Sequence, residues 1–159
     1  LGVTGHGTYA PAMHMQSLEA YPFDSILVPY NYTMMQQPQY AHDFNALYEM
    51  CQARGVAMQT IKGIAARRWQ DGDEEKRFSW YRPITDADAM KRAIDFVLSR
   101  ETLFINTSSD ATLLERSLDA IAQPTAEVDL ALLAEDAQRL GVEALFVRDV
   151  SDDVIISAG

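Results

Sequence analysis

The sequence predicts an α/β fold in which parallel strands alternate with helices. Four short apolar runs, rich in β-branched residues, are each followed by a turn and then by a helical pattern. The connections between these elements are short, which favours a parallel sheet backed by helices. With 159 residues, 48% of them hydrophobic, the chain is long enough to bury one core. We expect one domain over residues 1–148 and a tail over residues 149–159, acidic and then apolar, that forms an edge strand or a contact surface.

The four apolar runs are the expected strands. They cover residues 1–4, 25–28, 56–60 and 103–106. In parallel α/β folds the loops at the carboxyl ends of the strands vary while the sheet holds them in place, so function lies there. These loops read GHG, PYN, IKG and TSSD along the chain. We therefore look for a site among them.

Two helices have clear start or stop signals. An N-cap and early acidic residues follow Thr85, and residues 90–98 then repeat apolar side chains on one face. A second helix covers residues 43–53 and ends at Arg54-Gly55, a basic last turn followed by a C′ glycine. Both patterns predict surface helices that pack one side against the sheet.

Two more amphipathic helices are predicted to begin near Asp110 and Asp129. The longest connection, over residues 63–83, has no periodic pattern, and its charged segment 71–77 is expected to be a solvated loop tip rather than a partner-binding patch. The side chains that the two helices are expected to bury are Leu114, Leu118, Ile121, Leu130, Leu133, Ala134, Ala137 and Leu140.

The charge and the cysteine count exclude several classes of function. A formal charge of −10 repels phosphate backbones, and the basic residues are scattered, so we expect no nucleic-acid partner. Cys51, as the single cysteine, cannot form an internal disulfide or a Cys-x-x-Cys zinc site, and no metal site is predicted. No apolar run reaches the roughly 18 residues of a membrane span, and no signal peptide is visible. We therefore expect a cytoplasmic protein with no membrane partner.

The segment GHGTYA matches the G-x-G-x-x-G/A spacing of a dinucleotide-binding turn and follows a predicted strand. Pro11 falls just after this turn, and no acidic residue ends the second strand to bind a ribose hydroxyl. A stand-alone, doubly wound nucleotide-binding domain is therefore an alternative hypothesis, in which a pyrophosphate binds at the first turn.

Three loops at strand ends carry groups that could do chemistry. In NTSSDATLLE small hydroxyl residues lead into a helix N-terminus, where backbone N–H groups favour a phosphate, although Ser109 or Asp110 would also serve as a helix cap. Lys62 could contact a phosphate or a polarised carbonyl group, or lie over the surface rim as an ordinary lysine. A surface or satisfied polar role is favoured for His6, although at a strand end it could also donate a proton.

Five segments together resemble the second half of an aldo/keto reductase. They are LGVTGH, FDSILVPYN, CQARGVAMQTIKGIA, WYRPITDADAMKRAIDFVLSR and FINTSSDATLLERSLDA, and they follow the family's order and spacing from Leu1 to about Val147. The resemblance implies that the four strands are the fifth to eighth of a (β/α)8 TIM barrel, so that this chain is half of a barrel. It also implies that the first four βα units are missing from this sequence.

The resemblance implies part of a cofactor site but no catalytic residue. Family members reduce aldehydes and ketones with NADPH, and their catalytic side chains come from the first half of the barrel. Thr107, Ser108 and Ser109 match the family's segment that cradles the adenosine 2′-phosphate, and Glu115 matches the residue that contacts adenine. Arg116 replaces an Asn of the family and could pair with a phosphate. The residues expected to bind NADP are Thr4, Lys62, Thr107, Ser108, Ser109, Glu115 and Arg116.

The nicotinamide end of the implied site departs from the family pattern. The family's Ser-Asn after the fifth strand aligns with Thr4-Gly5, its sixth-strand Gln with Leu27, and its seventh-strand Tyr with Ile61. This pattern is typical of a divergent branch, in which NADP binds through its diphosphate and adenosine ends.

Two functional hypotheses follow. In the first, the chain is the half barrel of an NADP-dependent oxidoreductase, which acts on a small carbonyl substrate only in the complete barrel and is inactive alone. A half barrel exposes two sheet edges and an apolar inner face, so we expect association with a second copy or with the missing amino-terminal half. In the second, the chain is a non-catalytic assembly module whose cofactor contacts have decayed.

Overall fold

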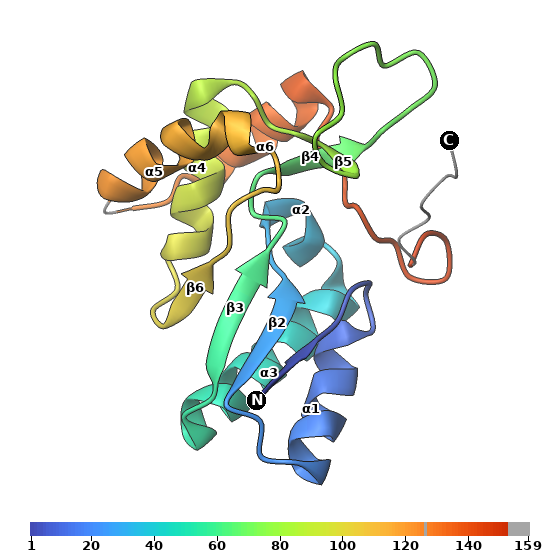
Figure 1. The fold of residues 1–159 in the computed structure, drawn as a ribbon, viewed down its shortest axis with the longest axis vertical. Coiled ribbons are helices and arrows are strands. Elements are labelled where there is room, and N and C mark those ends of the chain that lie inside the picture. The colour runs from blue at the N-terminus through green and yellow to red at the C-terminus, as the bar shows by residue number, and fades with distance from the viewer. Residues whose placement is uncertain (126, 153–159) are drawn as a thin grey trace.

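The computed structural model describes residues 1–125 and 127–152, and its centre is a parallel sheet of four strands (Figure 1). The strands are β1 (Gly2–Thr4), β2 (Ser25–Pro29), β3 (Ala57–Ile61) and β6 (Leu103–Ile105), and they lie side by side in the order β1-β2-β3-β6. All neighbours are parallel. The predicted α/β fold with alternating strands and helices is thus confirmed, as are its four strands.

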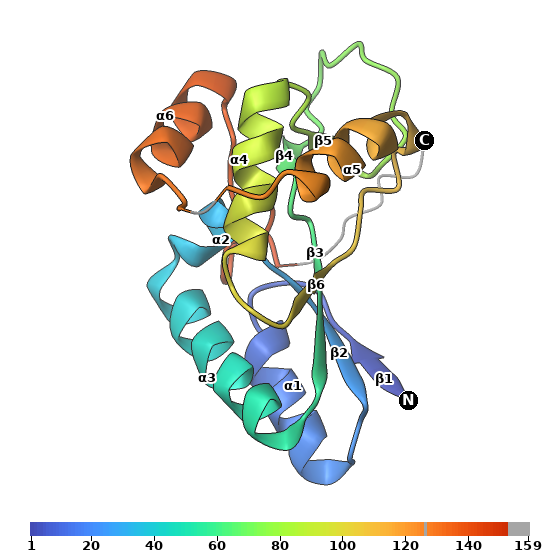
Figure 2. The same cartoon turned by 90° about the vertical axis from the view of Figure 1, so that its left-hand side faces the viewer.

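Helices cover one face of this sheet. α1 (Ala10–Ala20) and α3 (Pro38–Arg54) lie on the same side, and the short helix α2 (Tyr32–Met35) connects β2 to α3 (Figure 2). Strand side chains alternate between two faces, and those that point toward the helices are buried: Ile26, Val28 and Met58 are each at most 1% exposed. They pack against Phe44 and Leu47 of α3 in one apolar core.

The opposite face carries a row of four side chains in register. Thr4 pairs with Leu27, Leu27 with Gln59, and Gln59 with Phe104. Phe104 is 58% exposed, and none of the helices drawn for the described residues lies over this row (Figure 2). One face of the sheet is therefore open in the single chain.

Helix boundaries follow the signals in the sequence. Asp86 caps α4 (Ala87–Leu98) by accepting a hydrogen bond from Ala89 N at 3.0 Å. Gly55 ends α3 with φ 67°, in the left-handed region where a glycine carries no Cβ penalty. These two predicted boundaries are confirmed.

The connection over residues 63–83 is more ordered than its sequence suggests. It contains an antiparallel pair of strands, β4 (Ala65–Arg68) and β5 (Tyr81–Pro83), which the sequence pattern did not indicate. Arg67 of β4 makes a bidentate ion pair with Asp73 at 2.7 Å, and both side chains are only 11% exposed. Hydrogen bonds from Arg67 and from Gln70 N lower the pKa of Asp73. The rest of segment 71–77 is exposed, as expected of a loop tip.

The last two helices bury different faces from those predicted. A 3-10 turn, η1 (Ala111–Leu113), precedes α5 (Leu114–Ala122), and the buried side chains are Leu113, Ser117 and Ala120. Leu114 and Leu118 are 42% and 52% exposed, so their predicted burial is wrong. The physical reason is that α5 packs on α4 through its small residues, with Ser117 Oγ 3.9 Å from Met90 Sδ.

In α6 (Leu130–Leu140) the prediction holds only in part. Leu133 is buried, and Ala137 and Leu140 are half-buried. Leu130 and Ala134 are exposed, because α6 turns its Asp136 side toward Arg92 of α4. The helices α4, α5 and α6 lie with the β4–β5 hairpin at the end of the molecule toward which β2 and β3 point (Figure 1).

The beginning of the predicted tail is a contact surface. Tyr9 Oη donates a hydrogen bond of 2.9 Å to Asp149 Oδ1, and the Arg148 guanidinium lies 4.3 Å from the centroid of the Tyr9 ring. Asp152 reaches the same loop after β1. The remainder of the tail, residues 153–159, lies outside the described residues.

Candidate functional site

Residues from three strand ends meet at the carboxyl edge of the parallel sheet. Asn31 follows β2 and is 4% exposed; its Oδ1 accepts from Met34 N at 2.9 Å and caps α2. Its Nδ2 donates 3.0 Å to the carbonyl oxygen of Lys62, which follows β3. Asn31 thus ties the ends of the two central strands together. Ser108 follows the neighbouring strand β6.

Lys62 has an unusual backbone and an unusual environment. Its φ is 69°, a left-handed conformation that is strained for a residue with a Cβ. The side chain is 9% exposed, and Nζ lies 4.7 Å from the centroid of the Trp80 ring and 5.4 Å from that of Tyr81. Among the described residues no acceptor hydrogen-bonds to this ammonium group and no carboxylate pairs with it. It is held by aromatic faces alone.

Burial makes the Lys62 amine less basic. Removal from water lowers the pKa of Lys62 to about 8, because the charged form loses hydration. Partial desolvation and then the charge of Lys62 lower the pKa of His6, which follows β1. The charge of Lys62 is therefore felt at His6, across the ends of β1 and β3.

Tyr81 connects this lysine to the segment after β6. Its hydroxyl group donates a hydrogen bond of 3.2 Å to Ser108 Oγ, and Asp110 N donates to the same oxygen at 3.2 Å. Since Ser108 Oγ accepts twice, its own proton is left to donate to a ligand. The Asp110 carboxylate accepts from Thr112 N at 3.0 Å, so Asp110 is the cap of the following turn. Ser109 Oγ donates a 3.3 Å bond to Phe78 O.

The predicted cofactor residues are only partly brought together. The structure joins Lys62 to Ser108 through Tyr81, with Thr107 and Ser109 beside Ser108 in the chain. Glu115 and Arg116 lie further along on α5, where both are exposed and Arg116 donates 3.3 Å to Thr85 O. Thr4 lies on the edge strand β1, three strands away from β6. Among the described residues, no hydrogen bond, ion pair or ring contact joins Thr4, Glu115 or Arg116 to Lys62.

The sequence reasoning missed the aromatic half of this site. Trp80 and Tyr81 belong to the connection in which no periodic pattern was found, and Asn31 was noted only as part of a strand-end loop. The available signal was composition, because Phe78, Trp80 and Tyr81 give this polar connection an aromatic cluster. Such clusters in loops are typical of binding sites.

The dinucleotide-turn hypothesis does not fit the fold. Strand order β1-β2-β3-β6 runs in one direction and has no reversal, whereas doubly wound folds bind their dinucleotide where the order reverses. In addition, the carboxylate of Asp152 accepts 2.6 Å hydrogen bonds from Thr8 N and Oγ1, at the turn where a pyrophosphate would bind. A negative charge there repels phosphate. The stand-alone nucleotide-binding domain is therefore wrong.

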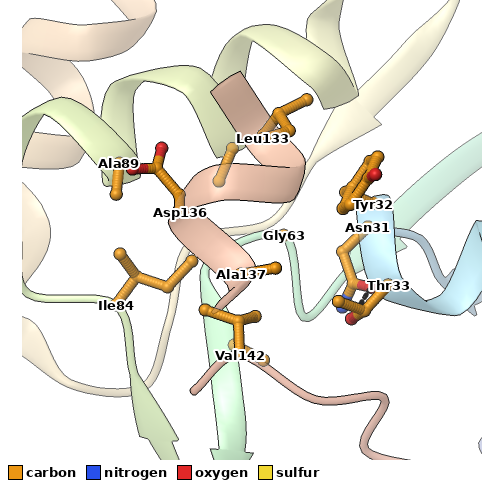
Figure 3. Close-up of a pocket in the computed structure, with 12 residues that line it drawn as sticks. Asn31, Tyr32, Thr33, Gly63, Ile84, Ala89, Leu133, Asp136, Ala137 and Val142 are labelled. Carbon is orange, nitrogen blue, oxygen red and sulfur yellow. Dashed lines mark hydrogen bonds between the residues drawn. The ribbon is translucent and has the colours of Figure 1, made fainter. Parts of the chain in front are cut away.

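A small cavity between α4 and α6 is not a second site. Its volume is about 20 Å3, the space of a single water molecule, and Ile84, Ala89 and Val142 give it apolar walls (Figure 3). The one carboxylate in its lining, Asp136, is already paired with Arg92 at 2.6 Å. The side chains of Asn31 and Thr33 in this lining are hydrogen-bonded as well.

Two other kinds of site, a metal centre and a reactive thiol, are not found in the described residues. Within residues 1–125 and 127–152, no group of three His, Cys, Asp or Glu side chains is placed to hold a metal ion. Burial raises the pKa of the Cys51 thiol to about 11, so it is not a reactive thiolate near neutral pH. The helices of the same residues are all too short or too polar to cross a membrane.

Comparison with known proteins gives one structural similarity. No family model matches the sequence, and no curated protein matches it. Among solved structures, the aldo-keto reductase AKR11C1 from Bacillus halodurans (holo form) is similar at a TM-score of 0.44 and 14% sequence identity, over 88% of this chain and 48% of that chain. The chain therefore spans about half the length of that reductase.

Proposed function

We propose that this chain is half of an aldo/keto-reductase-like barrel and binds the phosphate groups of NADP at the carboxyl ends of its strands. The observation that carries the proposal is the pair Lys62 and Ser108. A cation without a carboxylate partner among the described residues and a hydroxyl group with a free proton lie on either side of Tyr81. Such groups are complementary to a phosphate.

The topology supports the barrel half of the proposal. The strands advance in one direction, α1 and α3 cover only one face, and the other face is open, as in a segment of a (β/α)8 barrel. Edge strands β1 and β6 both have one side without a strand partner among the described residues. We infer that a second copy or an amino-terminal half barrel completes the sheet, and that a small carbonyl substrate is reduced only in that complete barrel. Alone, the chain is inactive.

Calorimetric titration of NADPH into the chain tests the cofactor part. We expect the double substitution Ser108→Ala with Ser109→Ala to weaken binding by roughly tenfold or more, because the free Ser108 hydroxyl proton and the neighbouring Ser109 hydroxyl group are lost. Ser99→Ala, at the exposed end of α4, is the matched control and should leave binding unchanged. NADH, which lacks the 2′-phosphate, should bind more weakly than NADPH. If NADPH does not bind, or if the double variant binds it as well as the unchanged chain, the cofactor proposal is wrong.

The second candidate function, a non-catalytic assembly module, is favoured by the row Thr4, Leu27, Gln59 and Phe104 on the open face. Phe104 lies on the edge strand β6, and an exposed phenylalanine on an open sheet face is typical of an interaction surface. Sedimentation of the chain, alone and as Phe104→Ser, tests it. A defined oligomer that Phe104→Ser dissociates, without NADPH binding, supports this candidate, whereas a well-folded monomer of 17.8 kDa contradicts it.

A further inference from the structure

We propose that Lys62 is a nucleophilic amine that condenses with small aldehydes or ketones to form an imine. The proposal stands on the cluster of Lys62, Trp80, Tyr81 and His6 and requires no NADP. It shares Lys62 with the proposed cofactor site, but it does not depend on whether NADP binds there.

The surroundings of Lys62 differ from those of the other two lysines. Lys91 is paired with Asp95 and donates 2.9 Å to Thr125 Oγ1. Lys76 is exposed on the loop tip, 4.8 Å from the Phe78 ring centroid. Lys62 alone combines burial with the lack of an anionic partner in the described part of the chain.

The amine nitrogen is held in place yet reaches the solvent. The hydrogen bond from Asn31 to Lys62 O fixes the left-handed backbone, and the two rings confine the side chain. In the described residues, every fully buried side-chain nitrogen and oxygen atom has a hydrogen-bond partner. Lys62 Nζ has none, so this atom is not fully buried, and in this proposal a small carbonyl compound reaches it from the solvent.

Burial favours the neutral form of Nζ, and the charged and titratable groups around it supply no anion that would oppose this. They are His6 from the loop after β1, Tyr81 from β5 and, on the Trp80 ring that Lys62 also touches, the Arg68 guanidinium at 5.8 Å. None is an anion at neutral pH. With a pKa of about 8, Lys62 has on the order of 100-fold more neutral amine at pH 7.5 than an ordinary lysine.

The reaction balances without an oxidant or a reductant. The Nζ lone pair forms a bond to the carbonyl carbon, the carbonyl π pair moves to oxygen, and that oxygen takes up a proton. The nitrogen loses a proton, the resulting hydroxyl group is protonated and leaves as water, and the C=N bond forms as nitrogen loses its second proton. In this proposal His6, whose pKa the charge of Lys62 lowers, supplies and accepts the protons in these steps.

Reductive trapping tests the proposal on the chain as it is. The protein is treated with propionaldehyde and cyanoborohydride at pH 7.5, and peptide mass spectrometry then locates the alkylated amines. We expect Lys62 to be labelled roughly tenfold faster than Lys76 or Lys91. The α-amine of Leu1, which pairs with Asp24, is on a separate peptide and serves as an internal reference. Labelling of Lys62 no faster than that of Lys76 overturns the proposal.

Two variants and a second probe sharpen the result. Lys62→Arg keeps the charge but cannot form the imine, so its peptide should stay unlabelled while Lys76 and Lys91 react as before. Trp80→Leu removes the aromatic ring that lies against Nζ and should bring the labelling rate of Lys62 toward that of Lys76. An unchanged labelling rate would show that the aromatic contacts do not cause the reactivity of Lys62, and would overturn the proposal. Glyceraldehyde 3-phosphate is an aldehyde that also carries a phosphate group. If it labels Lys62 faster than propionaldehyde does, and if Ser108→Ala abolishes this difference, the phosphate site is supported. Equal labelling by both probes leaves the imine proposal standing and contradicts the phosphate site.

Discussion

Asp152 accepts two hydrogen bonds of 2.6 Å from Thr8, one from the backbone N and one from Oγ1, across 144 positions of the sequence. The approach is close enough that a Cβ on Gly7, whose φ is 79°, would lie 2.5 Å from Asp152 O. Arg148 adds a 3.2 Å hydrogen bond to Thr8 O. The end of the described chain is therefore anchored on the loop that leads from β1 into α1.

Removing this anchor should destabilise the fold. Asp152→Ala leaves the Thr8 donors without their charged acceptor, and we expect the free energy of unfolding to fall by about 1–2 kcal/mol in urea titrations. Asp71→Ala, which removes the same charge from the exposed loop tip, is the control and should change it by less than about 0.5 kcal/mol. Equal effects of the two substitutions would show that the Thr8 contact contributes nothing.

Lys62 should cost the protein stability at neutral pH. Its folded pKa is about 8 against 10.5 unfolded, so between these values the unfolded chain binds more protons and stability rises with pH. Below pH 8 the Lys62 amine is charged in the folded state, so the full cost of burying that charge applies. Lys62→Met removes it, and we expect a gain of about 1–3 kcal/mol at pH 7 that shrinks as the pH approaches 10.

The measurement is a series of urea titrations between pH 7 and pH 10, with Lys76→Met as the control on the exposed loop tip. A destabilised Lys62→Met protein would mean that the contacts of the ammonium group with Trp80 and Tyr81 outweigh its desolvation.

His14 should make the fold sensitive to mild acid. It is 3% exposed, its Nε2 lies 3.0 Å from Leu27 O, and burial lowers its pKa below 6.5. As the pH falls through 6.5, the unfolded state takes up a proton that the folded state resists, so stability decreases. Unfolding in urea at pH 7.5 and 5.5 should show this loss, and His14→Gln should reduce it. The exposed His42 is the comparison, and His42→Gln should still lose stability between pH 7.5 and pH 5.5. An identical response of both variants would contradict the assignment of this loss to His14.

Two leucines five positions apart test which face of the 3-10 turn and α5 is buried. Leu113 is 6% exposed and Leu118 is 52% exposed. Leu113→Ala should lower the free energy of unfolding by about 2–4 kcal/mol, because it leaves a cavity against α4, and Leu118→Ala by less than about 0.5 kcal/mol. The reverse order would restore the face predicted from the sequence pattern.

Much of the site's frame could be predicted from the sequence. Lys62 and Ser108 were placed at strand ends because their strands are apolar runs of the right length, and parallel strand ends share one edge. The cap at Asp86 and the left-handed Gly55 follow from near neighbours in the chain alone. These signals are local, so they can be read without knowing any tertiary contact.

The sequence by itself determined the alternation of strands and helices, the helix caps and the residues at the carboxyl edge of the sheet. Only the tertiary structure decided that Trp80 and Tyr81 lie over Lys62, and that Leu113 rather than Leu118 is buried. The physical reason is range. Periodicity and capping depend on residues within about four positions, whereas the contact from Lys62 to Trp80 exists only after β4 and β5 pair, and the buried face depends on where the neighbouring helix packs.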